Sequence, residues 1–246
     1  MLGRRCGVTH GLTLAAAVAL TAGCATLHYR DIQADFEHAV EADHAEQLQP
    51  VVDSTALYAA VVDNLSDQQI EALDPKLRAN AYLIRSFSAW RARQLELATK
   101  SAEAGVREPG LVANSRDDVL LHLVPALVID SEIMARWRAA DRKTSQDDYP
   151  SYEMDFKTAV EKLDAAAGRI GPPTPESVVH YVTYQRWRIY QNWRGVISGI
   201  DDPQTRQTAK ENAKQGGKSL KQAAAAAKQT IPAGQALHQI MTAQGG

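Results

Sequence analysis

Tryptophan followed by arginine is the most distinctive arrangement of ligand-binding side-chain types in this sequence. All four tryptophans have an arginine directly after them. An arginine guanidinium pairs with a carboxylate or a phosphate, and the neighbouring ring can stack on a sugar or a peptide. One interpretation is therefore a groove that combines aromatic and cationic groups. The pairs are Trp90-Arg91, Trp137-Arg138, Trp187-Arg188 and Trp193-Arg194.

A simpler interpretation fits the same pairs. Consecutive helix residues lie about 100° apart around the axis, so they do not share a face. Each tryptophan would then anchor its helix in the core while the next arginine points to water. The densest aromatic and cationic stretch covers residues 184–194, and we expect any ligand or partner surface there. Its candidate residues are Arg186, Trp187, Tyr190, Trp193 and Arg194.

Metal-binding and catalytic patterns are weak in this sequence. His38 and Glu41 are neighbours at a spacing of three, but His44 lies about 240° round an ideal helix from His38, which is poor ligand geometry. His122 sits in the most apolar segment and is expected to be a buried, hydrogen-bonded histidine. Neither a Ser/His/Asp arrangement nor a glycine-rich phosphate loop nor a paired-carboxylate motif is recognisable. We therefore expect no metal, no cofactor and no enzymatic activity.

The two cysteines lie near the start of the chain, at Cys6 and Cys24. Cys24 follows Arg4 and Arg5, an uncharged run over 12–20, and the small residues at 21–23. This is the three-part layout of a secretory signal. The apolar run is shorter than the ~20 residues that span a bilayer.

The ending Ala22-Gly23-Cys24 resembles the lipobox of bacterial lipoproteins. The resemblance implies cleavage before Cys24, a diacylglycerol on its sulfur and an acyl chain on its new amino group. Two or three chains anchor a protein firmly, whereas one chain binds only marginally. Ala25 after the cysteine implies the outer membrane by analogy with that class. An ordinary signal peptide with an incidental cysteine is the alternative.

Helix formers dominate the rest of the chain, and no segment alternates with a period of two. We predict an all-α fold of about eight helices in antiparallel hairpins, with Pro125 kinking or splitting the sixth. The predicted domains are a signal peptide (1–23), a helical periplasmic domain (24–202) and a basic, Ala/Gln-rich helical tail (203–246) that packs weakly. The helices are expected at roughly 29–47, 54–65, 66–73, 75–90, 95–106, 115–140, 152–169 and 175–197.

Two architectures remain open for these hairpins, a helical bundle and a tetratricopeptide-like (TPR-like) stack. The stretch from Asn80 to Gly110 is weakly similar to tetratricopeptide repeats. The small residues Ser86 and Ala89 would belong to its first helix, and Ala98 and Ala102 to its second. No self-similarity recurs at the period of about 34 residues that such repeats have.

Charge is distributed unevenly along the chain, although the net charge is only −2. Residues 31–74 contain many acids but neither lysine nor arginine, and residues 206–228 contain six basic residues and one acid, Glu211. The basic segment either folds back onto residues 31–74 or binds an anionic partner such as peptidoglycan or lipid head groups. Nucleic acid is not expected as a partner in the periplasm.

These observations predict an outer-membrane lipoprotein that is anchored through Cys24. Its helical periplasmic domain would act as a protein-binding or scaffold module with a partner in the envelope. The alternative is a ligand-binding lipoprotein that serves an envelope transport system, with the Trp/Arg stretch as its pocket. An enzyme of an envelope-modifying pathway is a third hypothesis.

Overall fold

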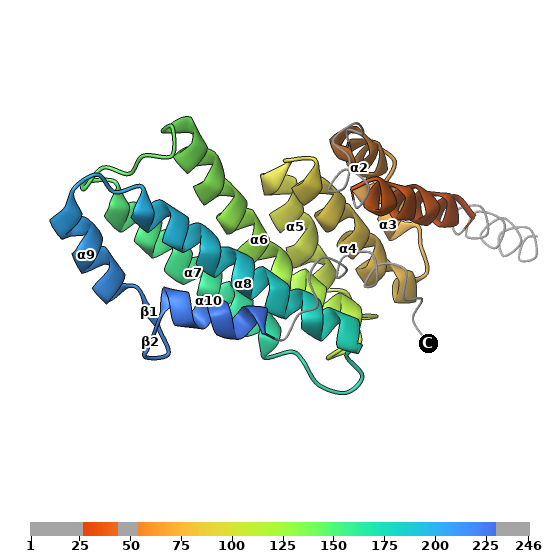
Figure 1. Ribbon diagram of the computed structural model, residues 1–246. Coiled ribbons are helices and arrows are strands. Elements are labelled where there is room, and N and C mark those ends of the chain that lie inside the picture. Colours follow the sequence, from red (N-terminus) through yellow and green to blue (C-terminus); the bar gives the residue numbers. More distant parts are fainter. Residues whose placement is uncertain (1–26, 44–53, 230–246) are drawn as a thin grey trace, which may run out of the picture.

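In the computed structural model, residues 27–43 and 54–229 are described, and over these ranges the fold is all-α with one short hairpin (Figure 1). The predicted fold class is therefore confirmed. None of the helices in these ranges is long and apolar enough to cross a membrane. The elements are a helix at residues 27–43, α2 (Ser54–Asp63), α3 (Asp67–Glu71), α4 (Pro75–Arg91), α5 (Leu95–Val106), α6 (Arg116–Ala139), α7 (Tyr149–Ala167), α8 (Glu176–Ser198), α9 (Pro203–Asn212), β1 (Lys214–Gln215), β2 (Lys218–Ser219) and α10 (Leu220–Lys228).

Most of the helices begin at capping residues that the sequence indicates. Asp74 accepts a hydrogen bond from the Lys76 amide ahead of Pro75, and Ser115 accepts one from the Asp118 amide. Such caps satisfy backbone donors that have no partner inside the helix. The predicted starts of α4 and α6 are therefore confirmed.

The predicted N-cap of α8 is wrong, and of the kink or split expected at Pro125 the split does not occur. Pro175, and not Thr174, is the N-cap of α8, because the Thr174 hydroxyl donates to the Asn114 carbonyl (2.6 Å) and accepts from the Gly171 amide (3.1 Å). Pro125 lies inside α6 without dividing it. The apolar residues on both sides of it, including Leu121 and Leu127, are fully buried.

Helix α6 is the centre of the molecule. It packs against α4, α5, α7 and α8, and each helix from α4 to α8 also contacts the next one along the chain. The approach of α5 is close at Gly105, where an added Cβ would lie 2.8 Å from a Leu121 methyl group and 2.9 Å from the Tyr82 Cβ. Glycine at this position lets α5 sit against both α4 and α6.

The helix at residues 27–43 buries the face that its sequence predicts. Ile32, Phe36 and Val40 are all nearly inaccessible to solvent. Near one end of the helix the Tyr29 hydroxyl donates to Asn80 Oδ1 on α4 (2.6 Å), and at the other end Asp43 forms an ion pair with Arg91. This helix is thus fastened to α4 at both ends.

Over the described residues, the basic segment packs against α8 and not along the acidic residues 31–43 and 54–74. Helix α10 packs along α8 with Leu220 and Ala224 buried, so it is not loosely attached. Figure 1 shows α9 and the β1–β2 hairpin at the end of the molecule remote from the helix at residues 27–43. The hairpin was not predicted, although its turn residues Gly216 and Gly217 have φ angles of 55° and 78°, as a two-residue hairpin turn requires.

Candidate functional site

A cavity of about 560 Å³ lies where α2, α4, α6 and α8 meet. Its volume is within the range of roughly 300–1,000 Å³ that is typical of small-molecule sites. Four arginines line it, together with Trp90 and Asp130, and we call this cavity the arginine pocket. The lining residues are Ser54, Thr55, Trp90, Arg91, Arg93, Leu95, Asp130, Ser131, Met134, Ala135, Arg138, Arg188 and Asn192.

Trp90 is fixed at the buried side of the pocket. Its indole Nε1 donates to Ser131 Oγ (2.9 Å) and to the Leu127 carbonyl (3.2 Å), and only 6 % of the residue is exposed. The guanidinium carbons of Arg91 and Arg188 lie 5.5 Å and 5.4 Å from its ring centroid. At this range the negative face of the ring attracts both cations.

Two buried carboxylates hold these same two arginines. Asp130 accepts hydrogen bonds from Arg188 Nη2 (3.1 Å) and from Asn192 Nδ2 (2.9 and 3.0 Å). Asp43 forms an ion pair with Arg91. Both carboxylate side chains are only 3 % exposed, so the pairs lie mostly out of water and are held firmly.

The same surroundings affect the phenol of Tyr58, which packs beside Arg91. The guanidinium carbon of Arg91 lies 5.7 Å from the Tyr58 ring centroid. Burial, and to a lesser extent the negative charge of Asp43, raises the pKa of Tyr58 far above its usual value. Tyr58 therefore stays a neutral phenol and adds no negative charge beside the pocket.

The other two arginines of the pocket differ in having no acidic partner. Arg93 and Arg138 are exposed, and within residues 27–43 and 54–229 neither forms an ion pair. Arg93 follows the end of α4 with a φ angle of 61°, and Arg138 lies in the last turn of α6. Asp43 and Asp130 thus balance two of the four cations, and among the described residues two positive charges remain.

The surface predicted over residues 184–194 is not one exposed face. Trp193 is fully buried, stacks on Phe156 with centroids 5.5 Å apart, and donates to the Tyr149 hydroxyl (3.4 Å). Tyr190 is also buried, and burial raises its pKa. These two aromatic residues belong to the core because they lie on the side of α8 that faces α7.

The other three residues of that surface each have a local role. Arg186 pairs with Asp164 of α7 (2.6 Å), and Arg194 donates to Gln191 one turn away (3.0 Å). Trp187 is half-buried and has the Lys228 ammonium of α10 6.0 Å from its ring centroid. The contacts of Arg186 and Trp187 join α7 and α10 to α8, and that of Arg194 lies within α8.

The Trp-Arg pairs indicated an aromatic and cationic site, but they did not indicate the position of the arginine pocket. Arg91, Arg138 and Arg188 each follow a tryptophan, and the fold brings these three arginines from different helices to one cavity. The fourth pair does not reach it. Arg93 carried no sequence signal beyond its charge, because its position depends on how α4 ends.

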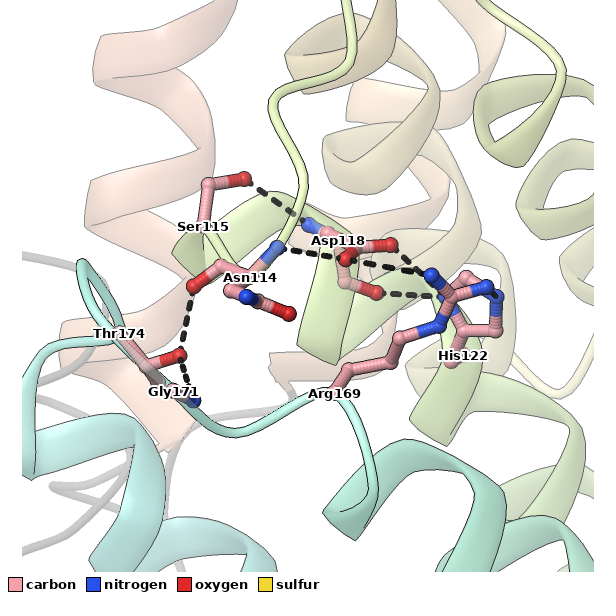
Figure 2. A network of polar contacts seen from close by, with 7 residues as sticks. All are labelled: Asn114, Ser115, Asp118, His122, Arg169, Gly171 and Thr174. Carbon is pink, nitrogen blue, oxygen red and sulfur yellow. Dashed lines mark hydrogen bonds and ion pairs between the residues drawn. The ribbon is translucent and has the colours of Figure 1, made fainter.

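A second polar cluster, drawn in Figure 2, joins the start of α6 to the α7–α8 connection. The Asp118 carboxylate is buried, accepts from the Asn114 amide (2.8 Å) and lies 3.2 Å from His122 Nδ1. Arg169 Nη2 is 3.3 Å from His122 Nε2. Because arginine only donates, Nε2 accepts and Nδ1 carries the proton. Both ring nitrogens are occupied, which supports the structural role expected of His122.

Cys24 and His44 lie outside the described residues. His38 and Glu41 are exposed, and over the described part of the chain no three His, Cys, Asp or Glu side chains gather as metal ligands would.

No protein-family model matches this chain, and neither a curated protein nor a solved structure matches it.

Proposed function

We propose that this protein binds a small anionic ligand in the arginine pocket and does so as a binding module. One observation carries the proposal: Arg93 and Arg138 line the pocket without an acidic partner among the described residues, while Arg91 and Arg188 already have one. An anion is the ligand that would balance this excess. Of the sequence-based hypotheses, the cavity favours ligand binding, and the scaffold role stays a prediction.

The side chains of the pocket suit an anion for physical reasons. A guanidinium group offers donors in a planar fork that matches carboxylate and phosphate oxygens, and it holds its charge at every physiological pH. Arg91 and Arg188 are positioned in advance by Asp43 and Asp130. A site that is already ordered loses less conformational entropy when the ligand arrives.

We also propose that the protein is anchored in the bacterial outer membrane through lipid on Cys24 and faces the periplasm. The support is the lipobox-like ending of the signal segment. Metabolic labelling with palmitate tests the anchor. Labelled wild-type chain and unlabelled Cys24→Ala chain are expected, and label that persists in the variant would refute the anchor.

Calorimetric titration of the processed chain with inorganic phosphate tests the binding function. We expect measurable binding, and a loss of about tenfold in Arg138→Ala, because a charged hydrogen bond contributes about 1.5–3 kcal/mol. Arg136→Ala is the matched control, since Arg136 lies two residues earlier on α6 and pairs with Asp155 outside the pocket. Equal weakening in both variants would contradict a site in the arginine pocket.

A further inference from the structure

We infer that the ligand is a phosphomonoester whose substituent is apolar, an inference that rests on the proposed function of the arginine pocket. Two features of the pocket point to this class. Two of the lining cations have no carboxylate partner in the part of the chain that the structure describes, and the wall beside them is apolar.

The number of lining arginines without an acidic partner among the described residues determines the ligand charge that we expect. A monoanion would balance only one of Arg93 and Arg138. A phosphomonoester carries about −1.5 to −2 charges at pH 7 and presents three acceptor oxygens. Both arginine side chains are exposed and have no ion-pair partner over residues 27–43 and 54–229, so they are free to converge on a single group.

The neutral polar groups in the deep part of the pocket are already engaged. Ser131 Oγ accepts from Trp90 and donates to the Leu127 carbonyl (2.8 Å). The Asn192 amide nitrogen donates to Asp130. A sugar-like ligand would need such groups to be available. Recognition therefore depends on the arginines, which favours an anionic head group over a hydroxyl-rich ligand.

The wall beside the arginines is apolar. Leu95 begins α5, and Met134 and Ala135 lie one turn before Arg138 on α6. Leu95 and Met134 are half-buried, and an unbranched methionine adapts to the shape of a bound apolar group. A ligand whose phosphate pairs with Arg138 would place its ester substituent against this wall.

Phenyl phosphate and phenyl sulfate form a matched pair of probes, because they have the same shape and differ in charge. Calorimetric titration of the processed chain at pH 7.5 is expected to show about tenfold tighter binding of phenyl phosphate. The difference should disappear at pH 5, below the second phosphate pKa of about 6. The charged groups that line the pocket are Arg91, Arg93, Asp130, Arg138 and Arg188, with no histidine among the described lining residues, so the transition belongs to the ligand.

Two further comparisons distinguish a failure of the phosphomonoester inference from a failure of the proposed function. Equal affinity for phenyl sulfate, or tighter binding of the dicarboxylate succinate, would overturn the phosphomonoester inference and leave the proposed function standing. Absence of binding by all three probes would overturn both. Inorganic phosphate is expected to bind more weakly than phenyl phosphate, and equal binding would refute the apolar substituent.

Variants locate the two parts of the ligand. Arg93→Ala should reduce the preference for phenyl phosphate over phenyl sulfate, because one uncompensated charge is gone. Met134→Gln should reduce the preference for phenyl phosphate over inorganic phosphate. Arg136→Ala is the control for both and should change neither ratio. A variant that leaves its ratio at the wild-type value would contradict the role assigned to that residue.

Discussion

Asp130 illustrates how one buried carboxylate organises the arginine pocket. It joins α6 to α8 through Arg188 and Asn192 and keeps the Arg188 guanidinium beside the Trp90 ring. A buried carboxylate is costly unless it is paired and hydrogen-bonded. Asp130 meets both conditions, so its role is to hold the wall of the pocket in place.

Replacing Asp130 with alanine should destabilise the protein strongly. The change leaves Arg188, whose side chain is only 25 % exposed, without its partner. Breaking such a pair costs about 3 kcal/mol in the free energy of unfolding. Urea denaturation measures the change.

Asp155→Ala is the control for that experiment. Asp155 pairs with Arg136, whose side chain is 47 % exposed, and such surface pairs contribute about 0–1 kcal/mol. Equal losses in the two variants would show that the pair at Asp130 is no more important than a surface pair.

At the residue scale, the Trp-Arg pairs and the arginine pocket have residues in common. The Trp-Arg pattern indicated an aromatic and cationic site, and three of its arginines line the pocket. In the stretch 184–194, where the sequence places that site, two aromatic residues, Tyr190 and Trp193, lie in the core. A stretch rich in aromatic residues is as typical of a packed core as of a ligand-binding surface.

At the element scale, helix limits were predictable where a cap and an apolar stripe agree. The starts of α4 and α6 follow such signals, and the range of α5 was also predicted although its N-cap, Gln94, makes no side-chain hydrogen bond. Helix α7 begins at Tyr149, earlier than predicted, with Pro150 accommodated in its first turn. The helices that pack against α7 and α10 could not be predicted, because a local sequence pattern does not indicate tertiary contacts.

Gly105→Ala tests the close approach of α5 to its neighbours. Alanine favours a helix by up to about 1 kcal/mol over glycine, yet the added Cβ would overlap Leu121 and Tyr82. Overpacking of this kind costs about 1–3 kcal/mol. We therefore expect a net loss of stability in thermal unfolding.

Gly168→Ala provides the comparison at a helix end. Gly168 has a φ angle of −66°, and its added Cβ would meet only backbone oxygens at 3.4 Å. Its stability should be unchanged or slightly higher, because alanine restricts the unfolded chain. A Gly105→Ala chain as stable as this one would contradict the close packing.

At the scale of the whole molecule, charge is separated along the long axis. The acidic helix at residues 27–43, in which Arg30 is the one lysine or arginine, and the basic α9 and hairpin region lie at opposite ends (Figure 1). The sequence predicted both charge blocks, but only the fold shows that they are apart. The anionic partner expected for the basic segment stays a prediction.

Stability at alkaline pH should fall because of the buried tyrosines. Burial raises the pKa of Tyr149 to about 12, from about 10 in an unfolded chain. A group whose pKa is raised by folding contributes its full stabilisation below pH 10 and loses it between pH 10 and 12. The unfolding temperature should decline over that range, and less steeply in Tyr149→Phe. An unchanged slope in the variant would contradict this assignment.

Anomalous diffraction from crystals of the processed chain soaked in tungstate tests whether the arginine pocket binds a dianion. Tungstate is a tetrahedral dianion with strong anomalous scattering. We expect the highest anomalous peak inside the pocket, in contact with Arg93 and Arg138. Peaks confined to other sites, such as the lysines of residues 206–228, with none in the pocket, would contradict it.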